Sequence, residues 1–258
     1  MSADGVRGAA EAEAGTGEAG AGRLRARDGL LLVLTLASGA VDAVCFLGLG
    51  HVFTAVVTGN LVLLGLGLGQ ADWAAVARSA TAVGGYLIGV LAFARLLPRA
   101  TRADPWPRRA AYAVIVEALL QLGVAVTWLL LGGDPPGGVV FPLIGAYGIA
   151  MGTQSAVAQA VAVRGISTTY VTGTLTGLIT DLLVRRPGGR RHRALVILSV
   201  PLGALATALF LHLYRPAAPF LPFALTAAAV TTAMIVFRRH PRPSPTKPGT
   251  RPPPGTPA

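Results

Sequence analysis

The sequence predicts an all-α integral membrane protein with about six transmembrane helices, two short broken or re-entrant segments, and an inverted internal repeat. Three observations predict this fold class. Of the 258 residues, 53% are hydrophobic and 13% are charged, with a mean hydropathy of +0.61, whereas a soluble domain carries about 25% charged residues. Clusters of arginine lie at the ends of the apolar runs. One Thr-Gly stretch occurs in two copies, 114 positions apart.

Eight apolar segments follow one another along the chain, separated by connections rich in turn-forming and helix-breaking residues. They span roughly 29–50, 52–69, 74–97, 110–132, 139–162, 166–184, 194–214 and 218–237. A helix needs about 20 apolar residues to cross about 30 Å of hydrocarbon. The second and sixth segments are shorter than the others and follow the preceding segment closely.

The placement of arginine separates two topologies. Arginines cluster before residue 28, between 99 and 109, between 185 and 193, and directly after Phe237. Short loops rich in Lys and Arg stay in the cytoplasm. Eight spans would put the 99–109 connection outside. If the second and sixth segments enter and leave on one side, every cluster falls inside and only the lone Arg215 lies outside. We therefore expect six spans, both termini in the cytoplasm, and a multi-pass protein of the cell (plasma) membrane.

The same topology makes the two halves of the domain, 29–132 and 139–237, an inverted repeat. The Thr-Gly stretch is "VFTAVVTGNL" in the first half and "ISTTYVTGTL" in the second. At an offset of 114, Asp42 falls opposite Ala156. We expect one transmembrane domain over 29–237, a disordered leader over 1–28, and a disordered basic, Pro-rich tail over 238–258.

Glycine after threonine permits a helix to break, and broken segments at matching places in two inverted halves are a pointer to a transporter site. Half-helices starting near Asn60 and Thr174 would direct their positive dipole ends at a common midplane point. The alternative is close helix packing by small residues. Pairs suited to that role are Gly85/Gly89, Gly148/Gly152 and Gly173/Gly177.

Several polar residues interrupt the spans. Asp42 lies near the middle of the first span, where a carboxylate is costly, and no Lys or Arg lies at comparable depth. It is predicted to be a protonated acid, a cation ligand, or an acid in a water-filled cavity. Glu117 and Gln121 share a helix face and form either an interhelical hydrogen bond or part of a pathway. The candidate pathway residues are Asp42, Thr54, Thr58, Gly59, Asn60, Glu117, Gln121, Gln154, Thr168, Thr172, Gly173 and Thr174.

These features favour a small secondary transporter of an unidentified small solute, with its site between the two Thr-Gly stretches and Asp42 as the proton- or cation-coupling carboxylate. The alternatives are a channel and a non-transporting membrane scaffold, and a homo-oligomer stays open. The partner is the lipid bilayer. The net charge of +11 lies at span ends without an aromatic-interleaved basic face, so no nucleic acid is expected. No zinc-type histidine cluster, Ser-His-Asp group or paired catalytic carboxylates occur, so no enzyme, metal site or cofactor is expected.

The motif residues also resemble a known family. The stretches "SGAVDAVCFLGLGHVFTAVVTGNLVLLGLGLG" and "GTQSAVAQAVAVRGISTTYVTGTLTGLITDL" are similar to the YoaK-like family of bacterial polytopic membrane proteins. The resemblance covers about residues 29–237 and departs at Thr174, where many members carry Asn. It implies a membrane fold and leaves the substrate open. Its positions are Asp42, Phe46, Leu47, Leu49, Gly50, Phe53, Thr54, Thr58, Gly59, Asn60, Gln154, Thr168, Thr169, Thr172 and Gly173.

Overall fold

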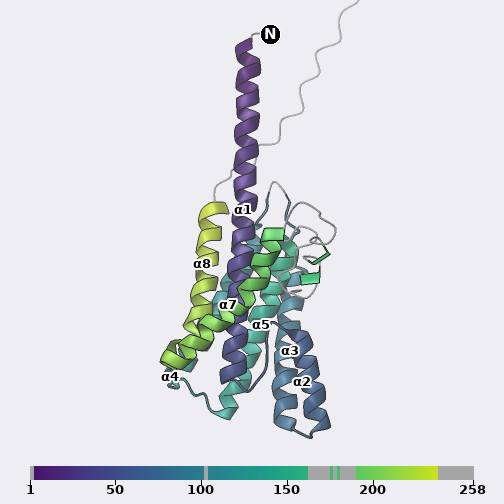
Figure 1. The fold of residues 1–258 in the computed structure, drawn as a ribbon, viewed down its shortest axis with the longest axis vertical. Coiled ribbons are helices and arrows are strands. Elements are labelled where there is room, and N and C mark those ends of the chain that lie inside the picture. The colour runs from purple at the N-terminus through teal and green to yellow at the C-terminus, as the bar shows by residue number, and fades with distance from the viewer. Residues whose placement is uncertain (1–2, 102–103, 162–174, 177–178, 181–189, 238–258) are drawn as a thin grey trace, which may run out of the picture.

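The computed structural model describes residues 3–101, 104–161, 175–176, 179–180 and 190–237. Every regular element in these ranges is a helix, which confirms the all-α prediction (Figure 1). The helices are α1 (Ala3–Gly48), α2 (Val57–Gly69), α3 (Trp73–Ala94), α4 (Arg108–Leu130), α5 (Gly137–Val161), α7 (Arg190–Tyr214), the short 3-10 helix η1 (Arg215–Ala217) and α8 (Phe220–Phe237).

Six helices in the described part are long and apolar enough to cross a membrane. They are α1, α3, α4, α5, α7 and α8, which match the six predicted spans. The helix α2 has 13 residues, too few for the roughly 20 that a span requires. The other short segment, 166–184, falls mostly outside the described residues.

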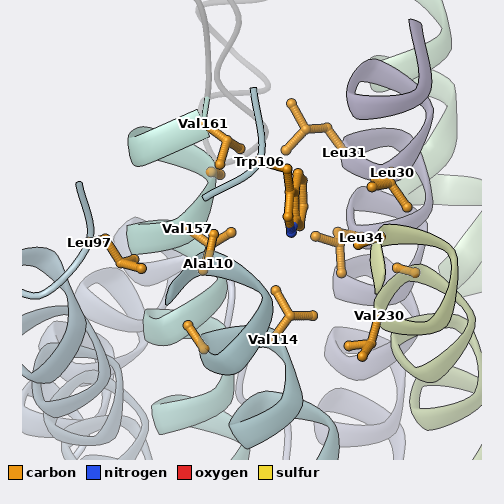
Figure 2. Packing of buried hydrophobic residues seen from close by; sticks show 14 of the residues in the cluster. Leu30, Leu31, Leu34, Leu97, Trp106, Ala110, Val114, Val157, Val161 and Val230 are labelled. Carbon is orange, nitrogen blue, oxygen red and sulfur yellow. The ribbon is translucent and has the colours of Figure 1, made fainter. Parts of the chain in front are cut away.

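The bundle has two chemically different ends. At the end that we call the arginine-rich end, Trp106 stacks on Phe237 with ring centroids 6.2 Å apart, and the Arg23 guanidinium lies 5.9 Å from the Phe237 ring centroid. Figure 2 shows Trp106 in the packed layer there, near Leu31 and Val161. The connection between α3 and α4, with its arginines, lies at this end.

At the opposite end, the Trp128 indole Nε1 donates to the backbone oxygen of Arg215 across 3.0 Å, and Arg215 Nε donates to the oxygen of Gly133 across 2.8 Å. Helices α1, α4 and α7 run towards this end, and α3, α5 and α8 run back (Figure 1). Helix α5 therefore ends, and helix α7 begins, at the same, arginine-rich end.

The outward surface of the bundle is apolar. Large hydrophobic side chains are exposed along several helices, and on α7 they follow one stripe. Soluble monomers rarely expose continuous apolar surface of this kind, so the stripe indicates contact with lipid chains. Its members on α7 are Leu195, Leu198, Leu202, Leu205, Leu209 and Leu213.

Glycines let pairs of helices approach closely inside the bundle. A Cβ added to Gly85 of α3 would lie 2.7 Å from the oxygen of Gly145 on α5, and one added to Gly148 would lie 2.8 Å from the oxygen of Ala82. Gly89 and Gly152 have still closer backbone neighbours across the same interface, the oxygens of Ile149 and Tyr86. Two of the predicted small-residue pairs therefore serve packing within one chain. The third, Gly173/Gly177, lies outside the described residues.

The structure differs from the sequence prediction at the amino terminus. A disordered leader was expected over 1–28, but helix α1 begins at Ala3. Alanine, the best helix former, is the commonest residue of this stretch, and no proline interrupts it. A helix that begins in the first span can therefore continue towards the terminus.

Candidate functional site

The first Thr-Gly stretch departs from helical structure. After α1 ends at Gly48, Gly50 and His51 adopt positive φ values of 96° and 63°, and the chain turns back. The left-handed conformation is easy for glycine and uncommon for histidine. Residues 52–56 form no helix, and we call them the interrupted segment.

Asp42 holds the interrupted segment against α1, within the last two turns before the helix ends at Gly48. Its Oδ1 accepts hydrogen bonds from the backbone N–H of Thr54, at 2.7 Å, and of Ala55, at 2.9 Å. The Thr54 hydroxyl donates to the same oxygen at 3.4 Å. Non-helical backbone at membrane depth is tolerated only where its polar groups are satisfied by protein or water. The carboxylate therefore supplies the acceptor that a continuous helix would have supplied, a role absent from the sequence hypotheses for Asp42.

Asn60 holds the same segment from α2. Its Oδ1 accepts from the backbone N–H of Phe53 at 3.0 Å, and its Nδ2 donates to the oxygen of Phe53. Asn60 is 1% exposed, so these groups have little access to water. Asp42 and Asn60 together satisfy the backbone of three consecutive residues, 53–55.

The threonines and the glycine of the motif have different surroundings. Thr54 is fully buried, with its Oγ1 3.6 Å from the sulfur of Cys45, whereas Thr58 is exposed. A Cβ on Gly59 would lie 3.2 Å from the Phe53 ring, so glycine allows that ring to pack against α2. The helix α2 begins at Val57, three residues before the predicted start at Asn60, and no side chain caps its first N–H groups.

A cavity of about 460 Å³ adjoins Asp42. It lies between α1, the interrupted segment and α7. Among the described residues Asp42 is the one polar member of its lining, in which Phe46 and Phe53 take part. Ligand pockets for small molecules are typically about 300–1,000 Å³ and mainly apolar. The cavity is therefore large enough for a small, mostly apolar solute group.

A second buried polar group lies between α4 and α8. Gln121 Nε2 donates to Glu117 Oε1 across 3.0 Å, and both residues are fully buried. The Thr226 hydroxyl of α8 lies near the Glu117 carboxyl. Glu117 Oε2, Gln121 Oε1 and Thr226 Oγ1 nevertheless make no hydrogen bond. Among the described residues no cation pairs with Glu117, so this buried acid has no counter-charge.

The remaining candidates are placed as follows. Gln154 of α5 donates from Nε2 to the backbone oxygen of Leu34 on α1 across 2.9 Å, which makes it an interhelical tie. Within the described ranges no hydrogen bond joins it to Asp42 or Glu117. The second copy of the motif is not placed, because these residues lie outside the described ones: Thr168, Thr172, Gly173 and Thr174.

Sequence reasoning missed three polar residues. Arg78 of α3 lies beside Gly50, so Arg215 is not the lone arginine of the opposite end. Tyr147 is buried next to Cys45 in one cluster, and Thr226 is buried near Glu117. A charge five residues into an apolar run signals Arg78, but a threonine or tyrosine in a span carries no such signal. Only the folded structure shows which neighbouring helix such a side chain faces.

Comparisons with known proteins agree with the membrane assignment. Residues 30–234 match the model of a family described as "Protein of unknown function (DUF1275)". The chain is similar to the UPF0700 transmembrane protein YoaK of Bacillus subtilis (strain 168), with 38% identity over 156 residues, which cover 60% of this chain and 67% of that protein. No solved structure matches the chain.

Proposed function

This chain belongs to the DUF1275 family, and we propose that it acts as a small secondary transporter of the cell membrane. The observation that carries the proposal is the interrupted segment, held by Asp42 and Asn60 within the bundle. Transporters place substrate and ion sites at such breaks, where half-helix ends and free backbone groups meet the solute. The cavity beside Asp42 gives the solute room.

The arrangement of helices supports an inverted repeat. Helices α1, α3 and α4 of the first half run opposite to α5, α7 and α8 of the second (Figure 1). The contacts between helices also correspond in the two halves. The packing of α3 on α5 corresponds to the packing of α7 on α1, and the packing of α4 on α5 corresponds to the packing of α8 on α1. A pseudo-two-fold axis in the membrane plane accounts for both the directions and the partners.

The close contacts of glycine give the register of this repeat. A Cβ on Gly152 of α5 would meet the oxygen of Tyr86, and one on Gly39 of α1 would meet the oxygen of Val200. Tyr86 and Val200 are 114 positions apart, which is the offset of the Thr-Gly copies. Gly39 and Gly152 are 113 positions apart. The offset between the halves is therefore 113 for α1 and α5, and 114 for α3 and α7.

This register changes which residue of the second half corresponds to Asp42. At an offset of 113, Asp42 corresponds to Ser155 of α5, whereas the single offset of 114 had placed it opposite Ala156. Ser155 is buried and polar, as Asp42 is. The two halves therefore each carry a buried oxygen side chain at this place in their first helix, with a charge in only one of them.

The coupling ion is assigned to Glu117 rather than to Asp42. Asp42 already accepts three hydrogen bonds from the interrupted segment, so support of the backbone accounts for its presence. Glu117 has no positive partner in the described part of the chain, and an isolated buried carboxylate is costly. A proton or a small cation at its free Oε2 would remove that cost. Gln121 and Thr226 supply further oxygen atoms there.

The proposed orientation follows from charge. The arginine-rich end is placed in the cytoplasm, because basic connections stay inside, and both termini then lie inside. His51 and the turn between α2 and α3 face outward. A scaffold role loses support, since Gly85 and Gly148 pack against each other's helices within the chain rather than facing outward.

Uptake into proteoliposomes tests the function. The purified full chain is reconstituted and screened against a panel of radiolabelled small solutes under an imposed pH or Na⁺ gradient. We expect saturable, gradient-driven accumulation of at least one solute. The variant Glu117→Gln should lose the gradient dependence and keep solute exchange, while Asp134→Asn, an exposed acid in the α4–α5 connection, should behave as wild type.

Two outcomes overturn the proposal. Flux that never saturates and ignores both gradients indicates a channel. A protein that binds a membrane partner stoichiometrically and moves no solute in the panel indicates a scaffold. Gradient-driven flux that survives in Glu117→Gln removes the coupling role from that residue.

A further inference from the structure

A second cavity lies at the opposite end of the bundle, where the chain turns back after α1. Its volume is about 240 Å³, and its lining joins the turn after α1 to the end of α2 and the start of α3. We call it the Arg78 cavity. The lining residues are Gly50, His51, Val52, Leu63, Leu66, Gly67, Gln70, Asp72, Ala75, Arg78 and Ser79.

Arg78 reaches this cavity without a partner of its own. In the described part of the chain it makes no hydrogen bond or ion pair, and its Nε is buried without a partner. A desolvated guanidinium nitrogen without an acceptor is unfavourable. The other arginine at this end, Arg215, differs, because it binds the Gly133 oxygen and lies 3.9 Å from the Asp134 carboxylate.

Two further features belong to the same place. Ser79 is 1% exposed, and its hydroxyl has no hydrogen-bond partner. A Cβ on Gly50 would lie 2.6 Å from Arg78 Cδ and 2.7 Å from Nε. The φ of 96° at Gly50 favours glycine, and the absence of a Cβ leaves room for the Arg78 side chain in its present position.

The one acid in the lining does not neutralise the arginine. The Asp72 carboxylate accepts from the backbone N–H of Ala75 at 3.0 Å and so caps α3, and no ion pair joins it to Arg78. The cavity thus holds an unpaired guanidinium, a buried unpaired hydroxyl and the exposed His51. These are donors, and a guanidinium is the side chain best shaped to bind carboxylate or phosphate through two nitrogens.

We propose that the Arg78 cavity binds a small oxyanion, the carboxylate or phosphate group of a soluble solute. Arg78 supplies the charge and Ser79 an additional donor. This assignment rests on and deepens the proposed function, since it gives the transported solute an anionic group and places its first contact at the outward end. The binding step itself requires no transport, so the two proposals can fail separately.

Ligand-dependent stability tests the site on the full chain in a phosphate-free detergent. The midpoint of thermal unfolding is measured against inorganic phosphate, acetate and succinate, with chloride at matched ionic strength as reference. We expect a saturable rise with at least one oxyanion. Arg78→Gln should weaken its apparent affinity about tenfold or more, because it removes charge-assisted hydrogen bonds to the anion. Ser79→Ala should weaken it less, and Arg78→Lys should keep part of it.

The matched control is Arg95→Gln, which removes the same charge from the exposed, arginine-rich end of the same helix and should leave the affinity unchanged. Equal weakening by Arg95→Gln and Arg78→Gln would show a non-specific charge effect and overturn the site. So would the absence of any saturable shift in wild type. A shift produced by phosphatidylglycerol but by none of the three soluble anions would also overturn it, because Arg78 would then bind a lipid headgroup.

Discussion

The backbone N–H of Thr54 donates to Asp42 Oδ1 across 2.7 Å, although the two residues are twelve positions apart. The bond joins the interrupted segment to the last two turns of the transmembrane helix α1. It gives a buried acid a structural task, because the N–H groups that lose their helical acceptors are bound by a carboxylate instead. Removal of the carboxylate should therefore lower the stability of the protein, and a loss of activity should follow from that loss of stability.

We predict that Asp42→Ala destabilises the protein strongly. The change leaves the N–H groups of Thr54 and Ala55 without an acceptor, and an unsatisfied buried donor costs about 1–3 kcal/mol, so roughly 2–6 kcal/mol should be lost. The measurement is the thermal unfolding midpoint of the purified protein in detergent.

Asp42→Asn separates the acceptor from the charge. Asparagine keeps an oxygen at the same place, so its loss should be about 1 kcal/mol, the difference between charged and neutral hydrogen bonds. If Asp42→Asn and Asp42→Ala are equally unstable, the charge matters rather than the acceptor, and the backbone-support role is wrong.

A second prediction concerns Asn60. Asn60→Leu keeps the volume of the side chain but removes both bonds to the backbone of Phe53, so the unfolding midpoint should fall by an amount similar to that of Asp42→Ala. Thr58→Val, two positions earlier on the exposed face of α2, is the control, and exposed substitutions usually change stability by less than about 0.5 kcal/mol. A larger effect of Thr58→Val would contradict this assignment.

The sequence was sufficient for the number of spans, because hydropathy and the placement of arginine are properties of separate segments. Residues 99–109 alone argued against eight spans, and the described part of the structure has six helices long and apolar enough to cross a membrane. The motif also identified Asp42, Thr54 and Asn60 as a group. Their mutual bonds were not predictable, since they depend on the chain turning back at Gly50 and lying beside α1, which no local pattern encodes.

The register of the proposed repeat could not be predicted from the sequence for a different reason. Apolar spans contain so few residue types that the sequence does not distinguish an offset of 113, which relates Gly39 to Gly152, from an offset of 114. Close backbone contacts, which only folded helices make, support the register of the proposed repeat. Arg78 was missed because a single charge near the start of segment 74–97 does not lower its hydropathy enough to stand out.

Neighbouring glycines of α3 give a third prediction. Gly85→Ala places a Cβ 2.7 Å from the Gly145 oxygen, whereas a Cβ at Gly84 meets nothing within 4 Å. Overpacking costs about 1–3 kcal/mol, and alanine at an open helical site gains up to about 1 kcal/mol over glycine. Gly85→Ala should lower the unfolding midpoint, and Gly84→Ala should keep or raise it. The reverse order would place the α3–α5 contact elsewhere.

The position of α2 leads to the last prediction, which concerns topology. His51 and Gln70 line one cavity, so the chain should enter and leave on the same side of the membrane. In a Cys45→Ala background, His51→Cys and Gln70→Cys should react with a membrane-impermeant maleimide from the same side, and Arg99→Cys from the other. All three positions are exposed, so failure to react cannot be assigned to burial. Reaction of positions 51 and 70 from opposite sides would make α2 a membrane-crossing element and reverse every later span, which would end the inverted repeat.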